Sequence, residues 1–356
     1  MDFASDNAAG ASRPILEALL ATNDEFCPAY GADRHTAEAE LALSAVFERD
    51  VASFLVATGT GANALALGAI TPPWGAVFCH EHAHIIDDEC GAPEMFSGGA
   101  KLVGIPGAIG KIIPAALRDT LARFPRGLVK QVQPAALCLS QATECGTIYT
   151  CAEIAELAAI AHAAGVCVHM DGARFANALI ALDCTPADMT WKAGADVLSF
   201  GATKNGALAC EAVVFFDRQR AADFAYQRKR GGHTLSKGRF VGVQMCAYLK
   251  DHHWLDLARH ANTAAARLEE GLRRSPGVRL PWARQVNEVF AILPKRADAA
   301  LKAAGARYYD WGTRSLSLEE APTKDEVFVR LISSFATKPA DIDRFVAIVA
   351  ESAIVA

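Results

Sequence analysis

Two kinds of apolar pattern alternate along the chain from about residue 36. Runs that are apolar at nearly every position predict buried strands at 51–58, 135–140, 166–172, 195–201 and 211–216. Longer stretches with helical periodicity predict helices at 36–50, 62–70, 114–124 and 150–165, with Thr36 as the cap of the first. Buried strands separated by helices require helices on both faces of the sheet. The pattern therefore predicts an α/β fold with a mainly parallel sheet.

The pattern changes after about residue 245. A long amphipathic stretch at 253–274 is followed by a further helix and by an apolar strand at 326–335. We therefore expect a large α/β domain over residues 1–245, including the N-terminal segment, and a small α+β domain over residues 246–356.

Composition and charge narrow the classes of function. The 356 residues are 52% hydrophobic and carry a net charge of −5, which disfavours a nucleic-acid-binding protein. The densest basic run, 227–239, is isolated on this acidic chain. No apolar run approaches the roughly 20 residues that span a bilayer, and the first ten residues lack the pattern of a signal peptide. The ten cysteines form no CxxC pair, and without a secretory signal a disulfide framework is not expected, so we expect a reduced, cytoplasmic enzyme. The charge and the lack of a long apolar run predict that it contacts neither nucleic acid nor membrane.

Three motifs follow predicted strands, at the sheet edge where α/β proteins bind ligands. The sequence "GTGAN" at 59–63 is a glycine-rich turn into a helix, which favours phosphate but also suits a plain tight turn. Asp171 ends an apolar strand and could face a ring nitrogen, pair with Arg174 or cap a helix. Lys204 could be a solvated loop lysine or an amine that forms a Schiff base. Together the three suit pyridoxal phosphate (PLP).

The sequence resembles a known family, the low-specificity L-threonine aldolases, which are fold-type I PLP enzymes related to the β-eliminating lyases. The resemblance covers nearly the whole chain. It rests on "SDN" at 5–7, "PAYGADRHTAEAE" at 28–40, "GTGAN" at 59–63, "HAHIIDDECGAPE" at 82–94, "HMDGAR" at 169–174, "GATKNG" at 201–206 and "VRLISSF" at 329–335.

The resemblance implies roles at the cofactor for five residues. Lys204 would form the Schiff base with PLP, and Asp171 would hydrogen-bond the pyridine nitrogen and keep it protonated. Gly59 and Thr60 would hold the phosphate, and His84 would stack on the ring. Lys204, Asp171 and His84 are thereby the expected catalytic residues.

The resemblance also implies how the substrate and a second subunit are bound. Ser5, Arg174 and Arg330 would surround the substrate carboxylate, with Arg174 also beside the cofactor. Tyr30 would reach a substrate, and Lys229 a cofactor phosphate, across the interface of a homodimer or homotetramer with shared active sites. A later arginine of the family has no clear match, because Ser236 or Lys237 stands near its place.

Two points of chemistry stay open in the sequence. His80, His82 and His84 alternate as metal ligands could, but nothing nearby completes a ligand set, so we expect no metal. Related enzymes often carry a histidine near the substrate's β-hydroxyl, where this chain has Gln131 and Gln133. Because an amide is no base at neutral pH, His84 or a water would take the hydroxyl proton.

The resemblance predicts cleavage of L-threonine, L-allo-threonine or L-phenylserine between Cα and Cβ, giving glycine and an aldehyde. Another PLP reaction, such as β-elimination or transamination, is the nearest alternative. A more distant one is a protein that binds a phosphorylated ligand through "GTGAN" without PLP. The sequence does not determine the preferred side chain or the configuration at Cβ.

Overall fold

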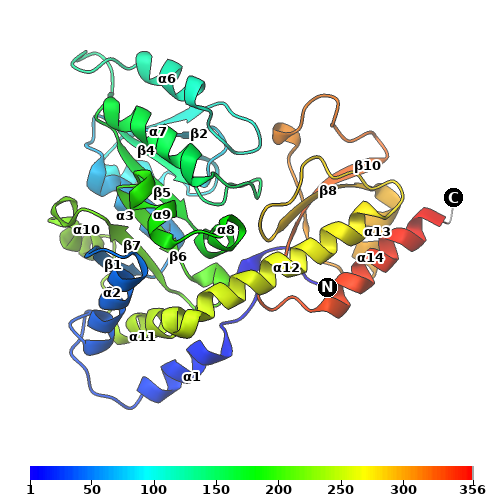
Figure 1. Ribbon diagram of the computed structural model, residues 1–356, viewed down its shortest axis with the longest axis horizontal. Helices are drawn as coiled ribbons and strands as arrows, with labels where there is room; N and C mark the ends of the chain where they lie inside the picture. The colour runs from blue at the N-terminus through cyan, green and yellow to red at the C-terminus, as the bar shows by residue number, and fades with distance from the viewer. Residues whose placement is uncertain (355–356) are drawn as a thin grey trace.

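A computed structural model describes residues 1–354 and shows a seven-stranded sheet covered by helices on both faces (Figure 1). The strand order is β1-β7-β6-β5-β4-β2-β3, and β7 runs antiparallel to both of its neighbours, whereas the other pairs are parallel. The strands are β1 Ala52–Val56, β2 Gly75–His80, β3 Lys101–Ile105, β4 Gln133–Ser140, β5 Cys167–Gly172, β6 Val197–Gly201 and β7 Glu211–Phe215. The predicted mainly parallel α/β fold is confirmed.

The helices divide between the two faces of the sheet because each strand buries apolar side chains on both. One face packs on α3 and α10, through residues such as Leu65, Val213 and Phe224. The other packs on α2, α7, α8 and α11, through residues such as Leu43 and Leu157. The helices from α1 to α11 are α1 Arg13–Thr22, α2 Arg34–Val46, α3 Gly59–Ile70, α4 His84–Asp87, α5 Ala92–Ser97, α6 Pro114–Ala122, α7 Cys151–Ala163, α8 Phe175–Leu182, α9 Pro186–Met189, α10 Phe224–Arg230 and α11 Arg239–Leu249.

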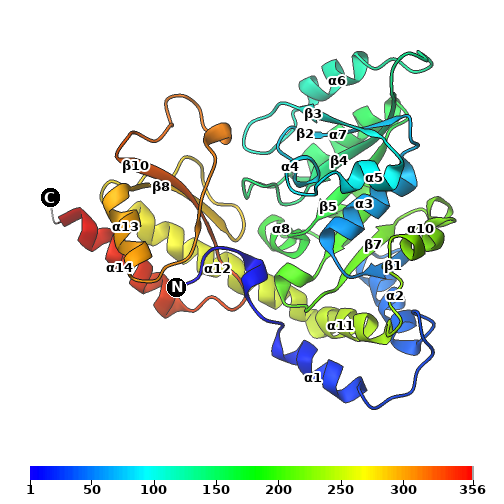
Figure 2. The ribbon, with the colours of Figure 1, turned by 180° about the vertical axis from the view of Figure 1, so that it is seen from behind.

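A second, antiparallel sheet of order β8-β10-β9 lies in the C-terminal part of the chain (Figure 2). Its elements are α12 His253–Arg273, β8 Glu288–Pro294, α13 Lys295–Ala303, β9 Tyr309–Asp310, β10 Glu326–Ile332 and α14 Pro339–Ile354. Phe3 packs in the core of this part with Leu331 and Phe345. The proposed division at residues 245 and 246 stays a prediction.

Each predicted strand and helix named above has a counterpart, with ends shifted by a few residues. The cap of α2 is a correction: Thr36 lies inside the helix, and the Asp33 side chain accepts from its N–H at 2.9 Å. Asp33 is the better cap because its carboxylate binds an unpaired N–H of the first turn. No helix within residues 1–354 is both long and apolar enough to cross a membrane.

Candidate active site

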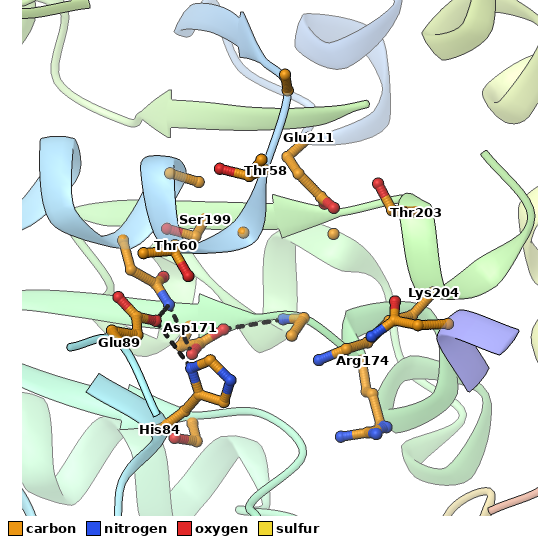
Figure 3. A pocket seen from close by; sticks show the side chains of 18 of the residues that line it. Thr58, Thr60, His84, Glu89, Asp171, Arg174, Ser199, Thr203, Lys204 and Glu211 are labelled. Carbon is orange, nitrogen blue, oxygen red and sulfur yellow. Dashed lines mark hydrogen bonds and ion pairs between the residues drawn. The ribbon is translucent and has the colours of Figure 1, made fainter. Parts of the chain in front are cut away.

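A cavity of about 370 Å³ lies at the carboxyl ends of the central strands (Figure 3). Asp171 enters it from the end of β5, Thr58 from the turn between β1 and α3, Thr60 from the first turn of α3, and Lys204 from the segment after β6. This is the edge of an α/β sheet at which ligands bind.

Asp171 is held by amide groups and not by an arginine. Its Oδ2 accepts from Asn63 Nδ2 at 2.9 Å and its Oδ1 from the Ala173 N–H at 3.0 Å. Arg174 pairs instead with Asp6, so the structural Asp171–Arg174 pair that the sequence allowed is not formed. The Asp171 carboxylate is therefore fixed in direction while it lines the cavity.

His84 is oriented by a buried carboxylate. Its Nδ1 lies 2.9 Å from Glu89 Oε1, and the same oxygen accepts from Asn63 at 2.8 Å. The hydrogen bond to Glu89 raises the pKa of His84, and burial raises the pKa of Glu89. One connected network thus joins His84, Glu89, Asn63 and Asp171.

The three alternating histidines do not converge on one point. His80 Nε2 lies 3.2 Å from the Gly107 carbonyl oxygen, whereas His84 faces Glu89. Elsewhere, ligand atoms of Glu25, Cys27 and His35 all lie within 4.8 Å of one another, but Arg34 donates to that same Glu25 carboxylate at 2.7 Å. That the protein holds no metal stays a prediction.

The N-terminus of α3 provides backbone donors toward the cavity. The first N–H groups of a helix have no partner inside the helix. The Thr58 side chain accepts the Gly61 N–H at 3.0 Å, which leaves those of Gly59 and Thr60 for an anion. A Cβ added at Gly61 would clash with the His233 ring and lie 2.9 Å from Thr58 Oγ1, so a larger residue fits there only if the His233 side chain moves.

Lys204 is held in place by the short segment around it. Asn205 donates to the Tyr248 hydroxyl and to the Trp254 carbonyl, both at 2.8 Å. Glu211, at the start of β7, accepts the Ala202 N–H at 2.8 Å and lines the cavity beside Lys204. Burial raises the pKa of Glu211 to about 7.

A second cavity, of about 560 Å³, adjoins the first and shares Lys204, His84 and Arg174 with it. Ser5, Arg174 and Arg330 line it. The Arg174 guanidinium donates to both oxygens of buried Asp6, at 2.8 and 3.1 Å. Although burial opposes the charge of Asp6, Arg174 and Lys204 outweigh it and lower the pKa of that carboxyl.

Glu288 lies behind the two arginines and is fully buried. Its Oε1 is 3.5 Å from Arg174 and 3.9 Å from Arg330, and burial raises its pKa. The Arg330 guanidinium also lies 4.0 Å from the centre of the Trp311 ring. Both arginines are therefore positioned by the protein itself.

Most of the predicted site residues line these two cavities. They are Ser5, Gly59, Thr60, His84, Asp171, Arg174, Lys204 and Arg330. Tyr30 and Lys229 line neither; the Lys229 ammonium lies 4.8 Å from the centre of the Tyr30 ring.

Gln131 and Gln133 also lie outside the cavities, because they stand before and at the start of β4, whereas the cavities lie at its end. Gln133 is held there by the Gly127 N–H at 2.8 Å. Because this segment lines neither cavity, its lack of a histidine does not change the groups that the described residues present there.

Several residues of the site were not predicted. Asn63, Glu89 and Asp6 fall inside the quoted motifs. Asn63 stands out as a polar residue among apolar neighbours, whereas Asp6 and Glu89 stand among other polar residues. The others are Glu144, Glu211, Asn287 and Glu288, whose proximity only the fold creates.

Comparison with known proteins agrees with this geometry. The model of the beta-eliminating lyase family matches residues 2–295. A low-specificity L-threonine aldolase of Pseudomonas aeruginosa is 42% identical over 86% of this chain and 88% of its own length, and one of a Pseudomonas species is 41% identical over the same shares. A solved threonine aldolase of Leishmania major is 29% identical, with a TM-score of 0.91 over 100% of this chain and 99% of its own. The chain therefore belongs to the beta-eliminating lyase family, as a relative of the low-specificity L-threonine aldolases.

Proposed function

We propose that this protein is a PLP-dependent aldolase that cleaves L-β-hydroxy-α-amino acids to glycine and an aldehyde. The observation that carries the proposal is the arrangement of the two cavities. Asp171, Lys204 and the N-terminus of α3 surround one cavity, which continues into another lined by Arg174 and Arg330. Family membership supports the same function.

The residues of the first cavity fit PLP by the chemistry of their donors. Lys204 offers an amine for the aldehyde, and the N–H groups of Gly59 and Thr60 suit the phosphate. The fixed Asp171 carboxylate suits a protonated pyridine nitrogen, and the His84 ring suits the face of the cofactor. When bound, PLP supplies an electron sink for the bond that breaks at Cα.

In the second cavity the protein positions the amino acid. Arg174 and Arg330 offer guanidinium groups to the substrate carboxylate, with Ser5 beside them. A carboxylate held on this side fixes the rotation of the substrate about its Cα–N bond, and so decides which bond at Cα can break. The groups that bind the substrate carboxylate thus favour one reaction among those that PLP can support.

A product assay tests the function. PLP-loaded protein is incubated with L-threonine, L-allo-threonine and L-phenylserine, and glycine and aldehyde are measured together with keto acids. We expect glycine and aldehyde in equal amounts. A keto acid in place of glycine would assign β-elimination or transamination, and no product from a PLP-loaded protein would overturn the proposal.

We also propose a homodimer or homotetramer in which Lys229 and Tyr30 serve the site of a partner subunit. Two observations support shared sites. Among the described residues, the lysine and arginine side chains that line the first cavity are Lys204 and Arg174, and a further cation from a partner subunit would help to balance a doubly charged phosphate. Apolar side chains in the segment that precedes Tyr30 in the sequence are exposed, with Leu20 at 75% and Phe26 at 106% of full exposure, as an interface requires.

Mixing two variants tests the shared site. Lys204→Ala and Lys229→Ala are inactive or weak alone, because each removes one half of every site. After the subunits are exchanged in equal amounts, each mixed dimer has one intact site, so about a quarter of the wild-type activity should return. No recovery after subunit exchange, as shown by light scattering and mass spectrometry, would contradict sharing.

We retain the cytoplasm as the proposed location. All ten cysteines are free, as in proteins of a reducing compartment.

A further inference from the structure

Glu144 lies where the two cavities meet and has no role in the function described so far. It stands four residues beyond the end of β4 and lines both cavities, as do His84 and Lys204. A substrate with its carboxylate at Arg174 and its amine at the lysine side would place Cβ at this junction. In that placement the Glu144 carboxylate would lie beside the substrate's side chain.

The two oxygens of Glu144 differ in their contacts. Oε1 accepts from the His84 N–H at 2.8 Å and from the Ser140 hydroxyl at 2.7 Å. Oε2 is buried and has no hydrogen-bond partner among residues 1–354. A buried oxygen without a partner is costly, so the carboxylate is fixed through one oxygen while the other is free to bind a donor.

The charged and titratable groups near Glu144 favour it over His84 as a proton acceptor. Burial and the nearby Asp171 charge raise the pKa of Glu144, which makes its carboxylate a stronger base than an exposed one. His84 is bonded through Nδ1 to Glu89, which raises its pKa as well, but Glu144 Oε2 has no hydrogen-bond partner among the described residues and is free to accept a donor. Arg174 and Lys204 line both cavities together with Glu144, and the Glu144 charge helps to raise the pKa of Arg174.

We propose that Glu144 accepts the proton of the substrate's β-hydroxyl group, an inference that rests on the proposed aldolase function. The hydroxyl proton moves to Oε2, the Cβ–O bond becomes the carbonyl of the aldehyde, and the Cα–Cβ bond breaks. PLP, when bound, would supply the sink for the electron pair of that bond. Cα takes up one proton in place of the one that the hydroxyl group loses, so the atoms and the charge of substrate and products balance.

Glu144→Gln tests this role because glutamine keeps the size and the Oε1 acceptor but cannot take the proton. We expect kcat for L-phenylserine to fall by about 10²- to 10⁴-fold, the usual loss for a general base. Exchange of the glycine α-proton in D₂O, which needs the cofactor and the arginines but no hydroxyl, should stay at the wild-type rate. The affinity for PLP, from titration of the visible absorbance, should also be unchanged.

A pH profile adds a second readout. Because the base must be ionised, kcat/KM of the wild type should rise with pH through the pKa of Glu144, and this acidic limb should be absent in Glu144→Gln. Glu144→Asp, which keeps a carboxylate, should retain the limb at a lower rate and also guards against a folding defect in the first variant.

Two results would overturn the inference. One is cleavage by Glu144→Gln at the wild-type rate; the other is a loss of glycine exchange as large as the loss of cleavage, which would make Glu144 a structural residue. Failure of the proposed function itself is a separate result, because the wild-type protein would then release no glycine.

Discussion

The two cavities differ in how their charged groups are held. In the first, Asp171 is bound by a neutral amide and a backbone N–H from its own sheet edge. In the second, Arg174 is bound by the buried carboxylate of Asp6, 168 positions away in the sequence. Hydrogen bonds from neutral groups leave the Asp171 charge for a cofactor, whereas the ion pair fixes an arginine before any substrate arrives. The first cavity thus presents the Asp171 carboxylate to a cationic group of a ligand, whereas the second presents an arginine whose direction is already fixed.

Removal of Lys204 should have the largest effect. Lys204→Ala deletes the amine of the first cavity, so cleavage of L-phenylserine should fall by at least about 10³-fold in kcat/KM, as measured from benzaldehyde release. Lys192→Ala, which removes an exposed lysine paired with Glu48, is the control and should cleave normally. Near-normal cleavage by Lys204→Ala would remove the basis of the comparison.

Breaking the ion pair of the second cavity should cost stability. Asp6→Asn leaves the buried Arg174 charge without its bidentate partner, so the free energy of unfolding should fall by about 3 kcal/mol, as measured in urea. Asp343→Asn breaks the exposed Arg267–Asp343 pair instead and should cost less than about 1 kcal/mol. Equal losses in the two variants would show that burial of the Asp6–Arg174 pair does not matter.

Arg330→Lys should separate substrate binding from chemistry. The lysine keeps the charge but loses the planar group that faces Trp311 and offers two parallel donors. We expect KM for L-phenylserine to rise by about tenfold with kcat nearly unchanged. If kcat falls and KM stays the same, Arg330 acts in the chemical step and not in binding.

The smallest effect concerns the His84–Glu89 pair. Glu89→Gln removes the negative charge that stabilises the imidazolium, so the pKa of His84 should fall. Since that pKa is raised in the folded protein, the stability it contributes is complete below the unfolded value near 6.5 and is lost as pH rises through the folded value. Imidazole signals in an NMR titration measure the pKa of His84, and an equal pKa in the wild type and Glu89→Gln would contradict the role of Glu89.

The first cavity was largely predictable from the sequence, and the second was not. Asp171, Lys204 and "GTGAN" each follow an apolar strand, and parallel strands bring their carboxyl ends to one edge. By contrast, Asn287 lies within 3.2 Å of Asp6 across 281 positions, a contact that no local pattern indicates. The family resemblance supplied Ser5, Arg174 and Arg330, and their roles stay predictions.

Glu144 shows the same limit in another way. The sequence places it after a strand, in "SQATECGT" at 140–147, but not between two cavities with one oxygen unpaired. Sequence reasoning found Gln131 and Gln133 where related enzymes carry a histidine, at the opposite end of β4, and assigned the hydroxyl proton to His84 or a water. The direction of β4 in the sheet therefore decides which of these residues lie at the cavities and which lie at the opposite edge.

The most direct test of the account locates the lysine that holds the cofactor. PLP-loaded protein is treated with borohydride, which fixes PLP to that lysine, and the modified peptide is then sequenced by mass spectrometry. We expect modification at Lys204, which lines both cavities. Modification at Lys229 or Lys237 with Lys204 left free would contradict it.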